Sequence, residues 1–249
     1  MFIFVKKKNM KRLLFIVLCF LCCNAIAYDG IDLSHHNKIV SFAGINSKVK
    51  FAYLKATEGA NFKDPCYKKY NTGLRREGVL TGAYLFYRAE FSPERNFDNF
   101  KQVKKDDDLI PMIDFETGFN LYSIKEHRKR IKKLVSLFVQ EYGVNPIIYC
   151  TERTYIVYLK GNVDDCPIWI ASRRKPNVNC LLWQDNFKLG YIKGIQGGVD
   201  INYFINGNIE NLKTGNVPQV KKTDANTNFY TKIYLIKRKI CRFVKKLLY

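Results

Sequence analysis

Eight short apolar runs between residues 28 and 207 constrain the fold of this chain more than any other feature of its sequence. Each run is rich in β-branched and aromatic residues, and polar or amphipathic stretches separate the runs. The runs are GIDLS, VKFAYLKAT, VLTGAYLFYR, LIPMIDFE, NPIIYC, PIWIAS, LLWQD and VDINYFI. Strands that alternate with helices predict a parallel α/β barrel. An open doubly wound sheet is the alternative, but no glycine-rich phosphate-binding loop follows any of the runs.

Helical stretches are expected at residues 64–78, 92–105 and 123–143. In the last of them apolar residues recur at helical spacing and Gly143 supplies a stop signal. The last three apolar runs are separated by too little chain for full helices. The chain has 249 residues, of which 47% are hydrophobic, and this is enough for one domain with a large core.

Residues 1–27 have the pattern of a secretory signal peptide. Lys11 and Arg12 precede the apolar run LLFIVLCFLCC, and the small-residue segment AIA ends at Ala27 as a cleavage site. That run is too short for a transmembrane helix. Removal of this segment takes five basic residues from the formal charge of +20 and leaves +15. We therefore expect an exported protein, periplasmic or secreted, that attracts anionic partners.

Carboxylates follow a pattern along the predicted strands. Asp32 lies near the end of the first run and Glu58 just after the second; Asp114 and Glu116 end the fourth, and Asp200 begins the eighth. The carboxyl ends of barrel strands build the active site, so these acids are expected to converge. The period of two places Asp114 and Glu116 on the same side, with α-carbons about 6.6 Å apart. Such a cluster raises at least one pKa, and a protonated acid beside an ionised carboxylate is the arrangement that glycoside hydrolysis uses.

Four aromatic residues near strand ends are candidates for stacking on sugar faces, although each is also a plausible core residue. They are Tyr84, Tyr149, Trp169 and Trp183. A zinc site is disfavoured, because the only histidine besides His35 and His36 is His127, which is expected on a helix surface.

The eight runs, in this order, resemble glycoside hydrolase family 25, the muramidase-type lysozymes that cut bacterial peptidoglycan. The most specific segments are YDGIDLSHHN, LIPMIDFET and GVDINYF, and the resemblance extends from Tyr28 to about Asn206. It implies an irregular TIM-like barrel with five β/α units and three closing strands. It also implies hydrolysis of the β-1,4 bond between N-acetylmuramic acid and N-acetylglucosamine, without metal or cofactor.

The family's acidic site falls on Asp32, Asp114, Glu116 and Asp200. The resemblance makes Glu116 the proton donor, gives Asp114 the task of orienting or activating the substrate, and leaves Asp32 and Asp200 to shape the site. Glu58 and the four aromatic residues are expected to contact substrate. Whether a carboxylate or the substrate's own acetamido group supplies the nucleophilic push stays open.

Two segments depart from the family pattern near the expected cleft. WQDN has Asp185 where an aromatic residue is usual, and WIASRR is more basic than is common. These departures bear on subsite preference rather than on the chemistry. Cys166 and Cys180 precede neighbouring strands, so a disulfide between them at the bottom of the barrel is a hypothesis.

The C-terminal region is polar from residue 208 to 228, which predicts a linker. Residues 229–249 predict a basic amphipathic helix, with ten Lys or Arg against one Asp from Lys213 to the end of the chain. Such a helix suits an anionic membrane or wall surface, or it docks on the barrel. Nucleic-acid binding is disfavoured because no recognition motif is present. A monomer acting on peptidoglycan strands is expected.

Two alternatives to a secreted lysozyme stay open. One is a catalytically silent, peptidoglycan-binding barrel, which would keep the aromatic residues but lose the acids, and here all four acids are present. The other is a membrane-active basic protein that acts through its C-terminal helix.

Overall fold

The computed structural model describes residues 28–104 and 107–216. Its main feature is a closed barrel of eight strands, which are, in the order around the ring, β1 (Gly30–Leu33), β3 (Phe51–Glu58), β5 (Leu80–Phe86), β6 (Met112–Asp114), β7 (Ile147–Thr151), β8 (Ile168–Ser172), β9 (Leu182–Gly190) and β11 (Val199–Phe204). Each corresponds to one of the eight apolar runs, so the predicted barrel is confirmed. Neighbouring strands are parallel except at β11, which runs antiparallel to β1 and to β9.

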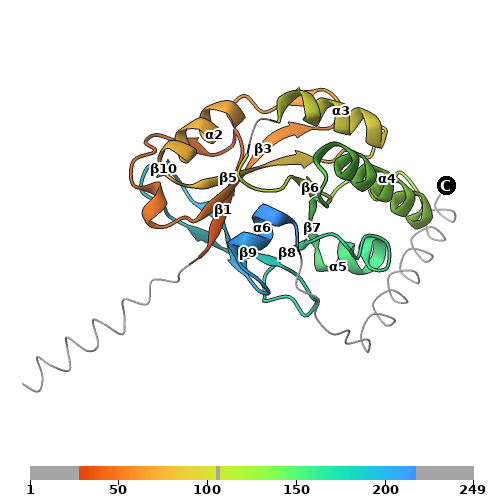
Figure 1. Ribbon diagram of the computed structural model, residues 1–249. Helices are drawn as coiled ribbons and strands as arrows, with labels where there is room; N and C mark the ends of the chain where they lie inside the picture. The colour runs from red at the N-terminus through yellow and green to blue at the C-terminus, as the bar shows by residue number, and fades with distance from the viewer. Residues whose placement is uncertain (1–27, 105–106, 217–249) are drawn as a thin grey trace, which may run out of the picture.

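Helices surround one part of this barrel (Figure 1). The longest are α2 (Tyr67–Arg76), α3 (Pro93–Val103) and α4 (Ile124–Tyr142), one in each predicted stretch. Both α3 and α4 begin at serine N-caps, and α4 ends at Gly143 in a left-handed conformation that glycine adopts without strain. Within residues 107–216 no helix of this length follows β8, β9 or β11, as the short connections predicted.

The remaining elements are short. A two-stranded sheet joins β2 (Lys38–Ile39) to β10 (Ile195–Gln196), and β4 (Phe62–Lys63) forms a hairpin with β3. The other pieces are the 3-10 turn η1 (Ile45–Ser47), α5 (Glu152–Thr154), the π-helical turn η2 (Tyr155–Leu159) and α6 (Ile209–Thr214). In the described part of the chain no helix is long and apolar enough to cross a membrane.

The interior of the barrel is filled by large side chains. Phe51 and Tyr53 of β3 contact the ring of Trp169 on β8, with centroids 6.3 and 5.3 Å apart. Since β3 and β8 are not neighbours in the ring, these side chains meet through the interior. Gly30 and Gly82 make room for them, because a Cβ at either position would lie 2.2 or 2.5 Å from an atom of Phe51 or Tyr53. The barrel is a packed core below its mouth rather than a pore.

The predicted boundary between the barrel and the linker differs from the structure at the bottom of the barrel. Residues 208–215 were expected in a polar linker, but α6 lies there with a capping box at its start. Leu212 of α6 is fully buried in the interior cluster, and its carbonyl accepts a hydrogen bond of 2.8 Å from the amide of Ile110. The barrel domain therefore includes α6. The rest of the linker, the signal segment and the basic C-terminal helix lie outside the described residues.

The cysteine hypothesis is not supported as stated. Cys166 and Cys180 line one small pocket at the bottom of the barrel, together with Asn179 and Asn206. Both carry free thiols in the structure, and burial raises the pKa of each thiol to about 12. They pack as small apolar side chains.

Candidate active site

Four carboxylates meet at the mouth of the barrel, where the parallel strands end. Asp32 lies near the end of β1, Asp114 is the last residue of β6, and Glu116 follows two residues later. Asp200 is the second residue of β11, and the antiparallel direction of β11 brings the start of that strand to the same end. Asp200 is thereby the direct partner of Asp32 in the β1–β11 pair. The convergence predicted from the sequence is confirmed.

Asp114 and Glu116 are separated by Phe115, which is fully buried against the helices. The two acids therefore point to the barrel side of the chain, as the strand period predicted. Asp114 is buried and Glu116 is partly buried. Burial is the largest cause of the raised pKa of Asp114, and the nearby Glu116 carboxylate raises that pKa further.

Asp32 is held by a chain of hydrogen bonds across the mouth. Its Oδ2 accepts from Nε2 of Gln184 at 2.8 Å and from Nδ2 of Asn202 at 2.9 Å. Gln184 in turn accepts from the hydroxyl of Tyr149 at 2.6 Å, and Asn202 accepts from Nε1 of Trp169 at 3.1 Å. The side-chain amides of Gln184 and Asn202 each have one orientation in this network, because each donates to Asp32 and accepts from a ring that lies inside the barrel. The position of the Asp32 carboxyl is therefore set by groups in the barrel interior.

Burial is the largest cause of a raised pKa at all four acids. It raises the pKa of Asp32 to about 7, with Asp200 and Glu116 adding to the effect and the two amide donors opposing it. The pKa of Asp114 lies well above its usual range, and the pKa values of Glu116 and Asp200 are also raised. Protons are therefore retained in this cluster at a pH where isolated carboxyl groups are ionised.

Asp114 has an unusual oxygen. Its Oδ1 is buried and has no hydrogen-bond partner among the described residues. A buried carboxylate oxygen in this condition is costly for the folded chain unless a bound molecule supplies a donor. The mouth thus offers an acceptor beside an acid that is partly exposed.

A buried cation lies next to the acids. Lys55, on the interior side of β3, is 6% exposed and donates to Glu58. Its Nζ lies 4.5 Å from the ring centroid of Phe86. Lys55 lowers the pKa of Asp114 and of Glu116, although burial outweighs this effect at both acids. The cation therefore limits how tightly these two acids hold their protons.

Glu58 was predicted to contact substrate, and the structure gives it other partners. It pairs with Lys55 and with Arg88, which lies two residues after β5; Nε of Arg88 lies 2.7 Å from Oε1 of Glu58. Burial raises the pKa of Glu58, but the hydrogen bonds and charges of its two partners lower it by more, so the net shift is downward. Glu58 is best described as the anchor of Lys55.

The predicted aromatic residues have three different positions. Tyr84 and Tyr149 lie on the interior side near the acids, and the pKa of each hydroxyl is raised by burial and by the neighbouring carboxylates. Trp169 is fully buried below the cluster, so its prediction as a sugar platform is wrong. Trp183 follows the inward-facing Leu182 and points outward, where it stacks on Tyr203 at 5.3 Å. It therefore lies outside the mouth, and that prediction is also wrong.

Sequence reasoning missed Lys55, Gln184 and Asn202. Each is a polar residue at an inward-facing position of an otherwise apolar strand, and this is the signal that could have found them. His127 was expected on a helix surface but is fully buried among rings that include Phe115 and Phe119. Among the residues that the structure describes, no three His, Cys, Asp or Glu side chains are grouped to hold a metal ion.

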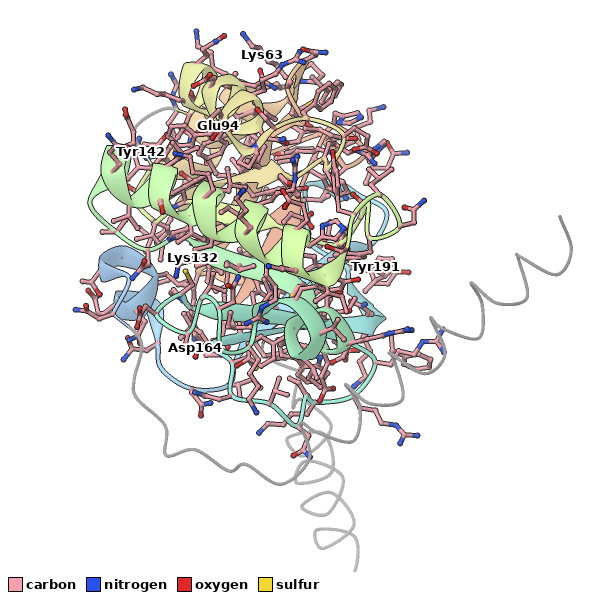
Figure 2. The ribbon with its side chains drawn as sticks, turned by 90° about the vertical axis from the view of Figure 1, so that its right-hand side faces the viewer. Lys63, Glu94, Lys132, Tyr142, Asp164 and Tyr191 are labelled. Atoms are coloured by element: carbon pink, nitrogen blue, oxygen red, sulfur yellow. The ribbon has the colours of Figure 1, made fainter. Side chains whose placement is uncertain are left out.

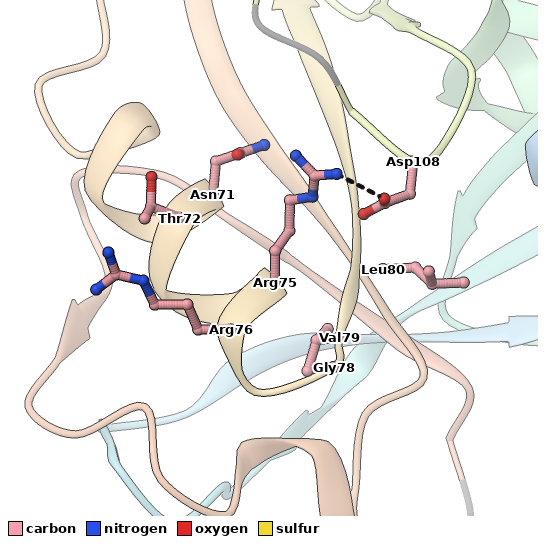
Figure 3. Close-up of a pocket in the computed structure, with 8 residues that line it drawn as sticks. All are labelled: Asn71, Thr72, Arg75, Arg76, Gly78, Val79, Leu80 and Asp108. Carbon is pink, nitrogen blue, oxygen red and sulfur yellow. Dashed lines mark hydrogen bonds and ion pairs between the residues drawn. The ribbon is translucent and has the colours of Figure 1, made fainter.

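A pocket elsewhere on the barrel does not compete with the mouth. A pocket of about 450 Å³ lies where α2 ends and β5 begins, at the opposite end of the barrel, and Arg75 pairs with Asp108 beside it at 3.0 Å (Figure 3). None of the four acids lines it. The candidate active site is the mouth, where the four acids lie.

Comparison with known proteins agrees with the barrel fold. The sequence model of Glycosyl hydrolases family 25 matches residues 31–189, which include three of the four acids. The chain belongs to this family. Family 25 members are glycoside hydrolases, so the chain is an enzyme of that class.

Three similar proteins illustrate the relationship. "Uncharacterized protein YegX" of Escherichia coli O6:H1 (strain CFT073) is 30% identical over 206 residues, which cover 78% of this chain and 75% of that protein. "Lysozyme M1" of Streptomyces globisporus is 28% identical over 206 residues, with 74% and 69% covered. The crystal structure of the bacterial lysozyme from Streptomyces coelicolor has a TM-score of 0.67 and 27% identity, and the match covers 74% of this chain and 94% of that one.

Proposed function

We propose that this family 25 enzyme is a lysozyme that hydrolyses the β-1,4 bond between N-acetylmuramic acid and N-acetylglucosamine in bacterial peptidoglycan. The observation that carries the proposal is the cluster of four carboxylates at the barrel mouth, whose pKa values are all raised by burial and, at Asp32, Asp114 and Glu116, also by neighbouring carboxylates. Two similar proteins named as lysozymes support the substrate class.

Glu116 is proposed as the general acid. It is partly exposed, so a glycosidic oxygen can reach it, and its raised pKa favours the protonated form that a leaving group needs. Lys55 opposes this shift and keeps the proton transferable. Proton donation to the leaving oxygen and stabilisation of the positively charged sugar ring are the two demands of glycoside hydrolysis.

Asp114 is proposed to orient the substrate. Its buried Oδ1 is an acceptor without a partner among the described residues, and the amide N–H of a 2-acetamido group is a donor of suitable chemistry. A hydrogen bond there would fix the acetamido group beneath the reacting carbon. In their ionised forms Asp32 and Asp200 would add negative charge that stabilises the developing cation, with Asp32 held in place by Gln184 and Asn202.

Export is part of the proposal, because peptidoglycan lies outside the cytoplasm. Residues 1–27 have a signal-peptide pattern, and cleavage after Ala27 would leave Tyr28 as the first residue of the mature protein. N-terminal sequencing of the protein recovered from outside the cytoplasm tests this step. Tyr28 as the first residue is expected, and an intact N-terminus would contradict export by cleavage.

The test of function is release of soluble fragments from purified, insoluble peptidoglycan. We compare the wild-type protein with Glu116→Gln, and use Glu94→Gln as control, because Glu94 lies on the surface of α3. Fragment release by the wild type and the control but not by Glu116→Gln is expected. Activity that survives Glu116→Gln but is lost in a chain ending at Asn216 would instead favour a membrane-active protein that acts through its C-terminal segment.

A further inference from the structure

Exposed apolar side chains are concentrated around the mouth of the barrel. Seven large apolar side chains in the described part of the chain are exposed, and only Val139, near the far end of α4, lies away from the mouth. The other six lie on segments that follow or extend the carboxyl ends of barrel strands, and they are Val40, Phe62, Leu121, Phe187, Leu189 and Tyr191.

Three of these side chains belong to one segment. Phe187, Leu189 and Tyr191 occupy alternate positions at the end of β9 and are 74%, 53% and 78% exposed. We call them the apolar ladder. Figure 2 shows Tyr191 at the end of the molecule opposite Tyr142, the last residue of α4. Because α4 begins at the mouth and runs away from it, Tyr191 lies at the mouth end.

The ladder shares a face with the catalytic acids. Leu189 is the direct partner of Asp200 in the β9–β11 pair, and Asp200 is the direct partner of Asp32 in the β1–β11 pair. Residues directly opposite each other in an antiparallel pair have side chains on the same face. Leu189 therefore continues the inner surface that carries Asp32 and Asp200, beyond the rim of the barrel.

Exposed basic residues lie beside the ladder. Lys188 and Lys193 are exposed on the same segment. Arg173 and Arg174 are exposed just after β8, whose last residue pairs with Asp185 of β9. Exposed aromatic rings with exposed cations at nearby positions suit a ligand that has flat apolar faces and negative charges.

We infer that the apolar ladder binds the part of an acidic, N-acetylated glycan strand that extends past the cleavage site; this inference rests on the proposed function. Phe187 and Tyr191 are about 13 Å apart along the strand, long enough to face more than one sugar ring. The adjacent cations meet the carboxylates of the strand.

Binding is measured in the Glu116→Gln background, so that the polymer is not digested. Co-sedimentation with purified insoluble peptidoglycan compares this parent with Phe187→Ser plus Tyr191→Ser, and with Val139→Ser as a matched control. The ladder variant is expected to bind about tenfold more weakly, whereas the control binds like the parent. Unchanged binding of the ladder variant overturns the inference. The same proteins are compared for binding to vesicles of phosphatidylglycerol. The inference is overturned if the ladder variant loses binding to the vesicles but keeps binding to peptidoglycan.

Kinetics in the active background provide the second readout. The ladder variant is expected to raise KM on long glycan strands about tenfold with kcat unchanged, and to leave hydrolysis of a tetrasaccharide unchanged. An equal loss on both substrates overturns the inference. Absence of hydrolysis by the wild-type protein would refute the proposed function. The sedimentation comparison would still measure the contribution of the ladder to peptidoglycan binding, because it does not depend on hydrolysis.

Discussion

Asp200 lies directly opposite Asp32 across the antiparallel pair of β11 and β1. This pairing exists because β11 runs against the other strands, so that its first residues, rather than its last, reach the mouth of the barrel. Two acids 168 positions apart in the sequence thus become neighbours. Burial, and after it the charge of Asp200, raises the pKa of Asp32 to about 7.

Asp32→Asn is expected to stabilise the fold at neutral and alkaline pH. The folded-state pKa of Asp32 is raised above the ordinary 3.8, so the folded state holds this proton more tightly and loses stability as the pH rises from about 4 through 7. A neutral amide removes that loss. The free energy of unfolding at pH 8 should rise by roughly 1 to 3 kcal/mol. Urea titrations at pH 8 and pH 4 measure it.

The gain from Asp32→Asn should shrink toward pH 4, where the carboxyl of the folded wild type is already neutral. Asp98→Asn serves as control, because Asp98 is exposed on α3. A loss of stability at pH 8 in Asp32→Asn, with none in the control, would contradict the electrostatic explanation and show that the carboxylate itself is required by Gln184 and Asn202.

Lys55→Met is expected to shift the pH profile of hydrolysis. Lys55 lowers the pKa of Glu116 and of Asp114, so its removal should raise both. The alkaline limb of kcat/KM, which reports loss of the catalytic proton, should move to higher pH. Lys63→Met, an exposed lysine on β4 that donates to Gln102, is the matched control. An unshifted alkaline limb would indicate that Lys55 only packs the barrel wall.

The two tryptophans should differ in stability cost. Trp169→Ala removes a fully buried ring from the barrel interior and should cost about 3 to 5 kcal/mol of unfolding free energy. Trp183→Ala removes a partly exposed ring that stacks on Tyr203 and should cost under about 2 kcal/mol. Chemical denaturation measures both. Equal costs, or a larger cost for Trp183→Ala, would contradict the assignment of Trp169 to the barrel core and of Trp183 to its outer surface.

The helix α6 should be required for folding. A chain that ends at residue 216 keeps Leu212 in the interior cluster and should unfold cooperatively, whereas a chain that ends at residue 207 should lose cooperative unfolding. Leu212→Ala in the full chain should cost about 2 to 5 kcal/mol. Thermal and urea unfolding of the three proteins measure the effect. Normal stability of the chain that ends at residue 207 would indicate that the barrel domain ends before α6, as the sequence predicted.

The strands and long helices could be predicted because their signals are local. Runs of β-branched and aromatic residues correspond to the barrel strands, and the apolar spacing with Gly143 gives the limits of α4. The acids could be predicted because strand ends converge in a barrel. Asp32, Asp114 and Glu116 lie at the mouth for that reason, whereas Asp200 lies at the start of β11 and reaches the mouth because that strand is antiparallel.

The environment of each side chain could not be predicted in the same way. Trp169 and Trp183 both lie in β-rich runs, yet one points into the barrel and the other outward, and only closure of the ring decides which. The register of β9 also shifts opposite β11 between Asp200 and Asn202, so alternation along β9 alone does not place its residues. In α6, a single buried leucine gives too weak a pattern to indicate a helix.

The most direct test of the central claim is mass spectrometry of the fragments that the protein releases from purified peptidoglycan, after reduction of the new ends. The wild-type protein should produce reduced ends on muramic acid, and Glu116→Gln should produce none. Reduced ends on glucosamine would contradict the proposed bond specificity. Muramic acid ends that appear equally with Glu116→Gln would contradict the assignment of Glu116 as the acid.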